Sequence, residues 1–178
     1  MLEPDKQQFL IHHLAQSAAD FEKAIAGVPP EQWSISPAPN QWSVGEIAEH
    51  VLIIDGNVAR FIAKMRELPE EPYDNNHCAR KDQLVMRVAD DRTIKIEAPP
   101  TVRPTGRLVS AAEFYMGFRE AQSRLTLAVS ENQDVLRGRF REHPVLRKLD
   151  GYQWLLVCSC HRIRHMHQIE EVKRTFAT

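Results

Sequence analysis

Three histidines occupy positions at which a helical bundle normally carries leucine or isoleucine. His161 and His165 stand four residues apart on a predicted apolar stripe that also contains Cys158 and Ile169. His50 lies on the apolar face of a second helical segment. Residues four apart lie one turn apart on the same side of a helix, so both imidazoles of the pair can bind one ion. We therefore predict a divalent-metal site formed by His50, His161 and His165.

The cost of burying three imidazoles supports this prediction. Burial of each ring costs free energy unless the ring finds a partner, and one shared ion is a partner for all three. Three protein ligands leave one or two coordination positions for water or substrate, as in catalytic sites. The ligand set suits zinc, nickel, copper, cobalt or iron alike. Taken singly, an H-x-x-x-H pair is a weak signal, and His50 could be a core histidine bonded to a backbone carbonyl or a carboxylate.

Four further residues close to the predicted ligands are candidates for a role at the site. Glu46, one turn before His50, could accept a proton from a ligand imidazole, act on a bound water, or simply cap its helix. Gln168 could hydrogen-bond a bound water or a neighbouring helix. Cys158 could approach the site, but a small buried side chain explains it better. His13 is the one plausible substitute ligand.

No chemical role is predicted for the remaining histidines or for the tryptophans. We expect the histidines on the surface or in loops and the tryptophans at the ends of a bundle. The charges of the Arg-rich segment LRGRFREH, residues 136–143, are predicted to be solvated and to have no functional role. The residues in question are His12, His77, His143, His167, Trp33, Trp42 and Trp154.

Four segments have the periodicity of amphipathic helices, and each has a start or stop signal. The first spans Pro4–Ala26 and ends at Gly27. Ser43 opens the second, which ends before Pro69, and Ser110 opens the third; both serines are followed three residues later by glutamate, as in a capping box. The fourth runs from near Asp150, where Gln153 could complete a box, through Val172.

The connection between the second and third helices is long. Part of it, residues 82–88, could form a short helix; a hairpin of residues 84–88 and 93–96 is the weaker alternative. Connections of this length are usually lids or crossovers between bundle helices. The sequence thus predicts an all-α protein, a four-helix bundle with one long crossover, as a single domain over residues 1–178.

Composition excludes several classes of function. The chain has 178 residues, 43% of them hydrophobic, and a formal net charge of -1, without the basic patch of a nucleic-acid-binding protein. The longest apolar run, Trp154–Cys158, is too short to span a membrane. Three cysteines do not form a disulfide framework, and the acidic N-terminus lacks the apolar core of a secretion signal. We expect a cytoplasmic protein that binds neither nucleic acid nor membrane.

Two motifs resemble a known family. WSVGEIAEH, from Trp42 to His50, and HRIRHMHQI, from His161 to Ile169, resemble the DinB/YfiT-like superfamily of metal-binding four-helix bundles. APPTVRPTG, residues 98–106, and the His143-Pro144 pair ahead of the Gly151–Trp154 segment fit the same pattern. The resemblance covers nearly the whole chain.

The resemblance implies an up-down-down-up bundle, with metal bound by His50, His161 and His165. It also implies zinc or nickel as the ion, a homodimer, and a small-molecule substrate. Characterised members of the family are mostly S-transferases or isomerases that use low-molecular-weight thiols such as bacillithiol, mycothiol or glutathione. Others have been called metal-dependent hydrolases.

Three functions follow as hypotheses. The first is a transferase in which the ion lowers the pKa of a thiol, since three neutral ligands leave the ion its full charge. The second is a hydrolase that activates a bound water, with Glu46 or Gln168 steering it. The third is a stress protein without catalysis, which binds a metal or another ligand.

Overall fold

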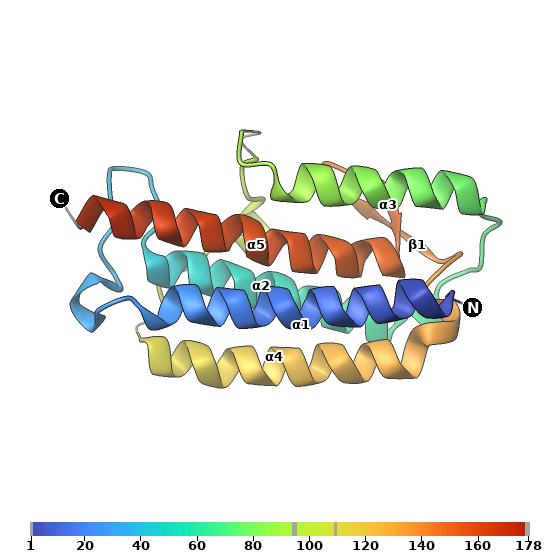
Figure 1. The fold of residues 1–178 in the computed structure, drawn as a ribbon, viewed down its shortest axis with the longest axis horizontal. Coiled ribbons are helices and arrows are strands. Elements are labelled where there is room, and N and C mark those ends of the chain that lie inside the picture. The colour runs from blue at the N-terminus through green and yellow to red at the C-terminus, as the bar shows by residue number, and fades with distance from the viewer. Residues whose placement is uncertain (1, 94–95, 109, 177–178) are drawn as a thin grey trace.

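The computed structural model describes residues 2–93, 96–108 and 110–176. Four long helices form a bundle: α1 (Pro4–Ala26), α2 (Val44–Ala63), α4 (Ala111–Asn132) and α5 (Gly151–Phe176). In Figure 1, α1 and α5 run in one direction, and α2 and α4 run in the other. The predicted four-helix bundle, with its up-down-down-up order and long crossover, is confirmed.

Local capping explains where three of these helices begin. Ser43 Oγ accepts from the Glu46 N–H at 3.2 Å, and Glu46 Oε2 accepts from the Ser43 N–H at 2.8 Å, which completes a capping box. Ser110 accepts from the N–H three residues on. Asp150 and Gln153 form the reciprocal pair at the start of α5, with distances of 2.9 and 3.1 Å. The predicted boundaries therefore hold at these three ends.

The apolar core has two clusters, which lie toward opposite ends of the bundle. One packs around Ile62, Met65 and Leu155. The other packs around Phe21 and Phe118, and includes Ile169 from α5. Because α2 and α5 contribute to both clusters, these two helices are fixed against each other along their lengths. Short 3-10 turns cover Pro30–Gln32, Met65–Glu67, Pro100–Val102 and Gln133–Val135.

The crossover contains more structure than the sequence predicted. Helix α3 spans Asn75–Asp90, more than twice the length of the helix predicted over residues 82–88, and packs beside α5. The Asp74 side chain caps it, since it accepts from the N–H groups of Asn76 and His77. The hairpin alternative is wrong, because residues 84–88 lie inside this helix; part of its second strand, residues 94–95, falls outside the described residues.

A short β-hairpin precedes α5 and was not predicted. Strands β1 (Phe140–His143) and β2 (Arg147–Asp150) are antiparallel, with Phe140 opposite Asp150. Each strand has only four residues, too few for an alternation of polar and apolar side chains to distinguish it from a loop. Their turn is held by His143, whose Nδ1 accepts from the N–H groups of Val145 at 3.2 Å and Leu146 at 3.0 Å.

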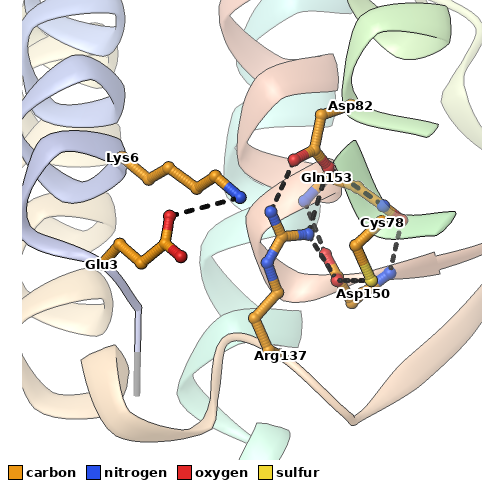
Figure 2. A network of polar contacts seen from close by, with 7 residues as sticks. All are labelled: Glu3, Lys6, Cys78, Asp82, Arg137, Asp150 and Gln153. Atoms are coloured by element: carbon orange, nitrogen blue, oxygen red, sulfur yellow. Dashed lines mark hydrogen bonds and ion pairs between the residues drawn. The ribbon is translucent and has the colours of Figure 1, made fainter. Parts of the chain in front are cut away.

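The prediction that residues 136–143 are solvated is wrong for Arg137. Figure 2 shows its guanidinium between Asp82 of α3 and Asp150 at the start of α5. It donates to Asp82 at 2.6 Å and to Asp150 at 2.7 Å. Gln153 donates to Asp82 at 3.1 Å, and the Arg137 guanidinium lies 4.2 Å from the centre of the Tyr152 ring. Arg137 is buried because its charge is matched on two sides. This cluster fastens the crossover helix to the bundle.

A second buried ion pair lies inside the bundle. Arg162 of α5 donates to Asp55 of α2 at 3.0 Å, and both side chains are fully buried. Asp55 also accepts from Gln122 of α4 at 3.1 Å and from the Cys158 thiol at 3.0 Å. Arg162 donates in addition to the backbone carbonyl of Leu14 in α1 at 3.0 Å. One polar cluster therefore contacts all four bundle helices.

Within the described part of the chain, no helix is both long and apolar enough to cross a membrane. The three cysteines, Cys78, Cys158 and Cys160, are buried and form no disulfide in the described part of the chain.

Removing one partner of the Asp55–Arg162 pair should destabilise the fold strongly. Arg162→Met leaves a buried carboxylate without its counter-charge, and we expect a loss of about 3–5 kcal/mol in the free energy of unfolding. The double variant Asp55→Leu/Arg162→Met removes both charges and should recover most of that loss. Urea unfolding followed by circular dichroism measures both.

Arg124→Met is the matched control, because it breaks an exposed pair with Glu120 on α4 and should cost less than about 1 kcal/mol. An Arg162→Met protein as stable as this control would contradict the assignment.

Acidification should weaken the hairpin turn through His143. Burial, and then nearby Lys81, lowers the pKa of this imidazole to about 4 from its usual 6.5. The unfolded chain therefore takes up the proton first as pH falls. The stabilisation of the folded state by neutral His143 is therefore complete above pH 6.5 and is lost progressively as pH falls to 4. Histidine NMR titration should give a pKa near 4 for His143, and a value of 6 or above would contradict the contact.

His143→Asn provides the control. An amide oxygen can still accept from the turn but does not titrate, so this variant should lose the part of the pH dependence of stability that His143 contributes.

Candidate metal centre

Three imidazole nitrogens converge between α2 and α5. His161 Nε2 lies 3.1 Å from His50 Nε2 and 3.0 Å from His165 Nε2. One nitrogen from each of the three rings fits within a group whose members are all less than 4.8 Å apart. His50 and His165 are buried, and His161 is partly exposed. The structure thus brings together the three residues that the sequence singled out.

A backbone carbonyl orients the first of these rings. His50 Nδ1 lies 2.7 Å from the carbonyl oxygen of Val102, in the crossover. A carbonyl oxygen only accepts, so Nδ1 carries the proton and Nε2 presents a lone pair to the centre. Burial lowers the pKa of His50, and the hydrogen bond to Val102 offsets part of that effect.

An amide orients the second ring. His165 Nδ1 lies 2.8 Å from Gln168 Oε1, one turn further along α5. With this assignment of the amide, Nδ1 donates and the Nε2 lone pair again faces the centre. Burial, and next the charge of His50, holds the pKa of His165 well below its usual value. Gln168 therefore contacts a predicted ligand directly, and its predicted contact with a bound water stays a prediction.

The third ring, His161, lies between the other two. Its Nε2 faces both lone pairs, and a single N–H there could donate to only one of them at good geometry. Its Nδ1 is buried and has no hydrogen-bond partner among the described residues. Burial, followed by the neighbouring His165 and His50, keeps the pKa of His161 well below its usual value. The ring is therefore neutral at pH 7, the state in which imidazole binds metal.

This geometry fits a shared cation. Imidazole nitrogens bound to one tetrahedral ion at about 2.0–2.1 Å are about 3.3 Å apart, close to the spacing seen here. Without a cation, lone pairs of the rings face one another in a space with little water, an arrangement that costs free energy. Among the described residues, no carboxylate joins the three imidazole nitrogens in this group of possible ligands. The residues present therefore suit a divalent ion bound by neutral nitrogen ligands.

Trp42 lies two residues before the start of α2, near an end of the bundle as predicted, and it also contacts the metal centre. Its ring centre lies 4.8 Å from that of His50 and 6.3 Å from that of His165. The tryptophan therefore packs against two of the three rings, where it restricts their rotation and keeps water away. Trp33 is buried, and Trp154 packs against Phe61 at the far end of the bundle.

The other candidates have contacts of their own. Glu46 caps α2 as described above, so its structural interpretation holds, and its possible catalytic role stays a prediction. The Cys158 thiol donates to Asp55, and burial raises its pKa well above the usual value, which disfavours the thiolate needed for metal binding. His13 Nδ1 lies 2.7 Å from Ser159 Oγ, outside the three-ring cluster.

The sequence matches a known protein family over most of its length. The sequence model of the DinB superfamily matches residues 13–169, most of the chain and all three histidines. The chain belongs to the DinB superfamily. This DinB protein is 24% identical, over 155 residues, to the uncharacterized protein YuaE of Bacillus subtilis (strain 168), with 84% of this chain and 88% of YuaE covered.

Two solved structures share the fold of this DinB protein. YfiT from Bacillus subtilis, described as a probable metal-dependent hydrolase with an unusual four-helix bundle topology, has a TM-score of 0.64 at 15% identity. That match covers 99% of this chain and 91% of YfiT. The four-helix bundle protein TT2238 has a TM-score of 0.61 at 16% identity, covering 93% and 98%. At such identities the likeness shows the fold.

Sequence reasoning missed two parts of the centre. The Val102 carbonyl is a backbone group and carries no signal of its own; the nearest hint was the Pro-rich segment APPTVRPTG ahead of the third bundle helix. The contact of Trp42 with two of the rings carries no sequence signal either, because Trp42 lies outside α2, two residues before its first residue.

Replacing any ring of the centre should remove metal binding. For His50→Ala, His161→Ala and His165→Ala we expect affinity for Zn²⁺ to fall at least about 100-fold, since two imidazoles cannot complete the site. The measurement is metal content by elemental analysis of protein purified without a His-tag or nickel column, followed by Zn²⁺ titration. His13→Ala, outside the cluster, is the control and should bind as the wild type does. Wild-type metal content in His50→Ala would refute the site.

Proposed function

We propose that this DinB protein is a metal-dependent S-transferase that activates a low-molecular-weight thiol at the three-histidine centre. The observation that carries the proposal is the convergence of three neutral imidazole nitrogens without a carboxylate ligand among the described residues. Such a set leaves a divalent ion its full positive charge. An ion of that kind, when bound, supplies a site that favours thiolate over thiol at neutral pH.

The residues of the chain would prepare the site before any substrate arrives. Val102 and Gln168 hold the outer nitrogens of His50 and His165, which fixes the tautomers that bind metal. Trp42 packs on both rings and keeps their surroundings apolar. In the transfer, the thiol releases its proton to solvent, its sulfur bonds to an electrophilic carbon of the substrate, and the leaving group departs with the electron pair of the broken bond.

Metal-dependent hydrolysis is the second candidate, supported by the likeness to YfiT. It requires a group that steers the bound water and one that accepts its proton; Glu46 could do both, whereas the amide of Gln168 could only steer the water. One oxygen of Glu46 accepts from the Ser43 N–H, and the Gln168 oxygen accepts from His165. These engagements favour the thiol, which ionises more readily than water and depends less on a general base.

Zinc is the ion we propose, with nickel as the alternative, and the substrate is a small molecule. A homodimer and a cytoplasmic location remain predictions from the family resemblance and the composition.

A panel of thiols should separate the two candidates. Protein loaded with Zn²⁺ or Ni²⁺ is mixed with bacillithiol, mycothiol or glutathione and a chromogenic electrophile, and adduct formation is followed by absorbance. We expect at least one thiol to react faster than in solution, and His161→Ala to abolish the gain. Ester or amide turnover without thiol would instead establish the hydrolase. The absence of both metal-dependent reactions would refute the enzymatic function.

A further inference from the structure

Glu49, next to His50 in α2, binds the backbone of the crossover. One carboxylate oxygen accepts from the Thr105 N–H at 3.0 Å and the Thr105 hydroxyl at 2.6 Å. The other accepts from the N–H groups of Gly106 at 2.8 Å and Arg107 at 3.2 Å. Four donors on one carboxylate are more than an ordinary surface glutamate has, and three of them are backbone groups. Glu49 therefore fixes the path of the main chain here.

The bound segment is part of a strap, residues 98–108, that contacts α2. At Gly106 the backbone adopts a φ of 74°, which other residues rarely adopt, and this turn brings two successive N–H groups onto the same carboxylate oxygen. The strap has a second attachment, because Trp33 Nε1 donates to the Leu108 carbonyl at 2.8 Å. A side chain at Gly45 would lie 2.6 Å from Trp33 Nε1, so the glycine makes room for this contact.

The attachment at Glu49 lies three residues along the strap from the carbonyl that orients the metal centre. Val102 ends a 3-10 turn, and its oxygen lies 2.7 Å from His50 Nδ1. The strap also folds back on itself, since Arg103 Nε donates to the Ala98 carbonyl at 3.0 Å. Successive residues of one helix, Glu49 and His50, thus contact the same strap at two points. Release of the first contact frees the chain that carries the second.

We propose that Glu49 is a positioning residue of the metal centre: through its hydrogen bonds to the strap, it holds the Val102 carbonyl on His50 and so fixes the tautomer and rotation of that ring. The proposal concerns the site described under the proposed function and rests on it for its consequence in metal affinity. Its effect on the tautomer and rotation of His50 does not depend on a bound metal. Glu49 touches neither substrate nor ion, and acts through the strap.

Glu49→Gln is the variant that tests this role. The amide keeps the size of the side chain but replaces one oxygen by an NH2 group, which cannot accept a hydrogen bond. Facing Thr105, the NH2 group can still donate to the hydroxyl but loses the N–H contact; facing Gly106 and Arg107, it loses both N–H contacts. We expect Zn²⁺ affinity to fall about tenfold, the lower end of the effect of losing an outer-shell partner. Gly106→Ala disturbs the same contact from the strap side without a clash, since nothing lies within 4 Å of the added methyl group. It should weaken binding in the same direction.

The decisive readout is imidazole 15N NMR of the metal-free protein. In the wild type, His50 and His165 should both be protonated at Nδ1. In Glu49→Gln, His50 should become a mixture of tautomers, while His165, held by Gln168, stays unchanged and serves as the internal reference. Glu120→Gln, an exposed carboxylate on α4, is the matched control and should alter neither ring.

The outcomes separate this proposal from the proposed function. A wild-type His50 signal and wild-type Zn²⁺ affinity in Glu49→Gln would overturn the positioning role. An equal loss of the Nδ1-protonated tautomer at His50 and His165, together with a lowered melting temperature, would also overturn it. Glu49 would then act on the fold as a whole. If the wild type binds no metal but His50 still responds selectively to Glu49→Gln, the metal centre is refuted and the positioning of His50 stands.

Discussion

The buried pair of Asp55 and Arg162 is the interaction on which the arrangement of this protein depends. It is the point at which all four bundle helices meet in hydrogen bonds, and its charges can be matched in only one register of α5 against α2. Apolar side chains tolerate small sliding movements, whereas a buried ion pair does not. Arg162 directly follows His161, and Asp55 lies five positions after His50. The register that satisfies the charges is therefore the one that aligns the histidines.

The metal centre is the next polar layer on the same two helices. Its nitrogen atoms lie in surroundings that disfavour charge on the rings, which is why burial lowers the pKa of each histidine. The same surroundings make the rings good ligands, because they remain neutral at pH 7. Polar groups outside the layer, Val102 and Gln168, then decide which nitrogen faces inward. The burial that packs α2 against α5 thus also keeps their imidazoles neutral and able to bind metal.

Much of this could be predicted from the sequence, for identifiable reasons. Helical periodicity and the capping residues Ser43, Ser110 and Asp150 are local signals, and they located the ends of the bundle helices. Histidines on apolar stripes are a conflict between residue type and position, and the conflict pointed to His50, His161 and His165. Arg137 and the full length of α3 escaped prediction because their stability comes from partners far along the chain. The carbonyl at Val102 escaped because backbone groups are the same at every residue.

The way the crossover is attached has a consequence for how this fold can diversify. Between α2 and α4 the chain is tied down at separate points, by Arg137 at α3 and by Glu49 and Trp33 at the strap. The stretches between those ties carry none of the three ligands. Insertions, deletions or whole replacements there could reshape what surrounds the centre and leave its nitrogens in place. These stretches, unlike the strap that carries Val102, are thus exchangeable parts on a constant base, and grafting them between relatives would be a practical way to transfer selectivity.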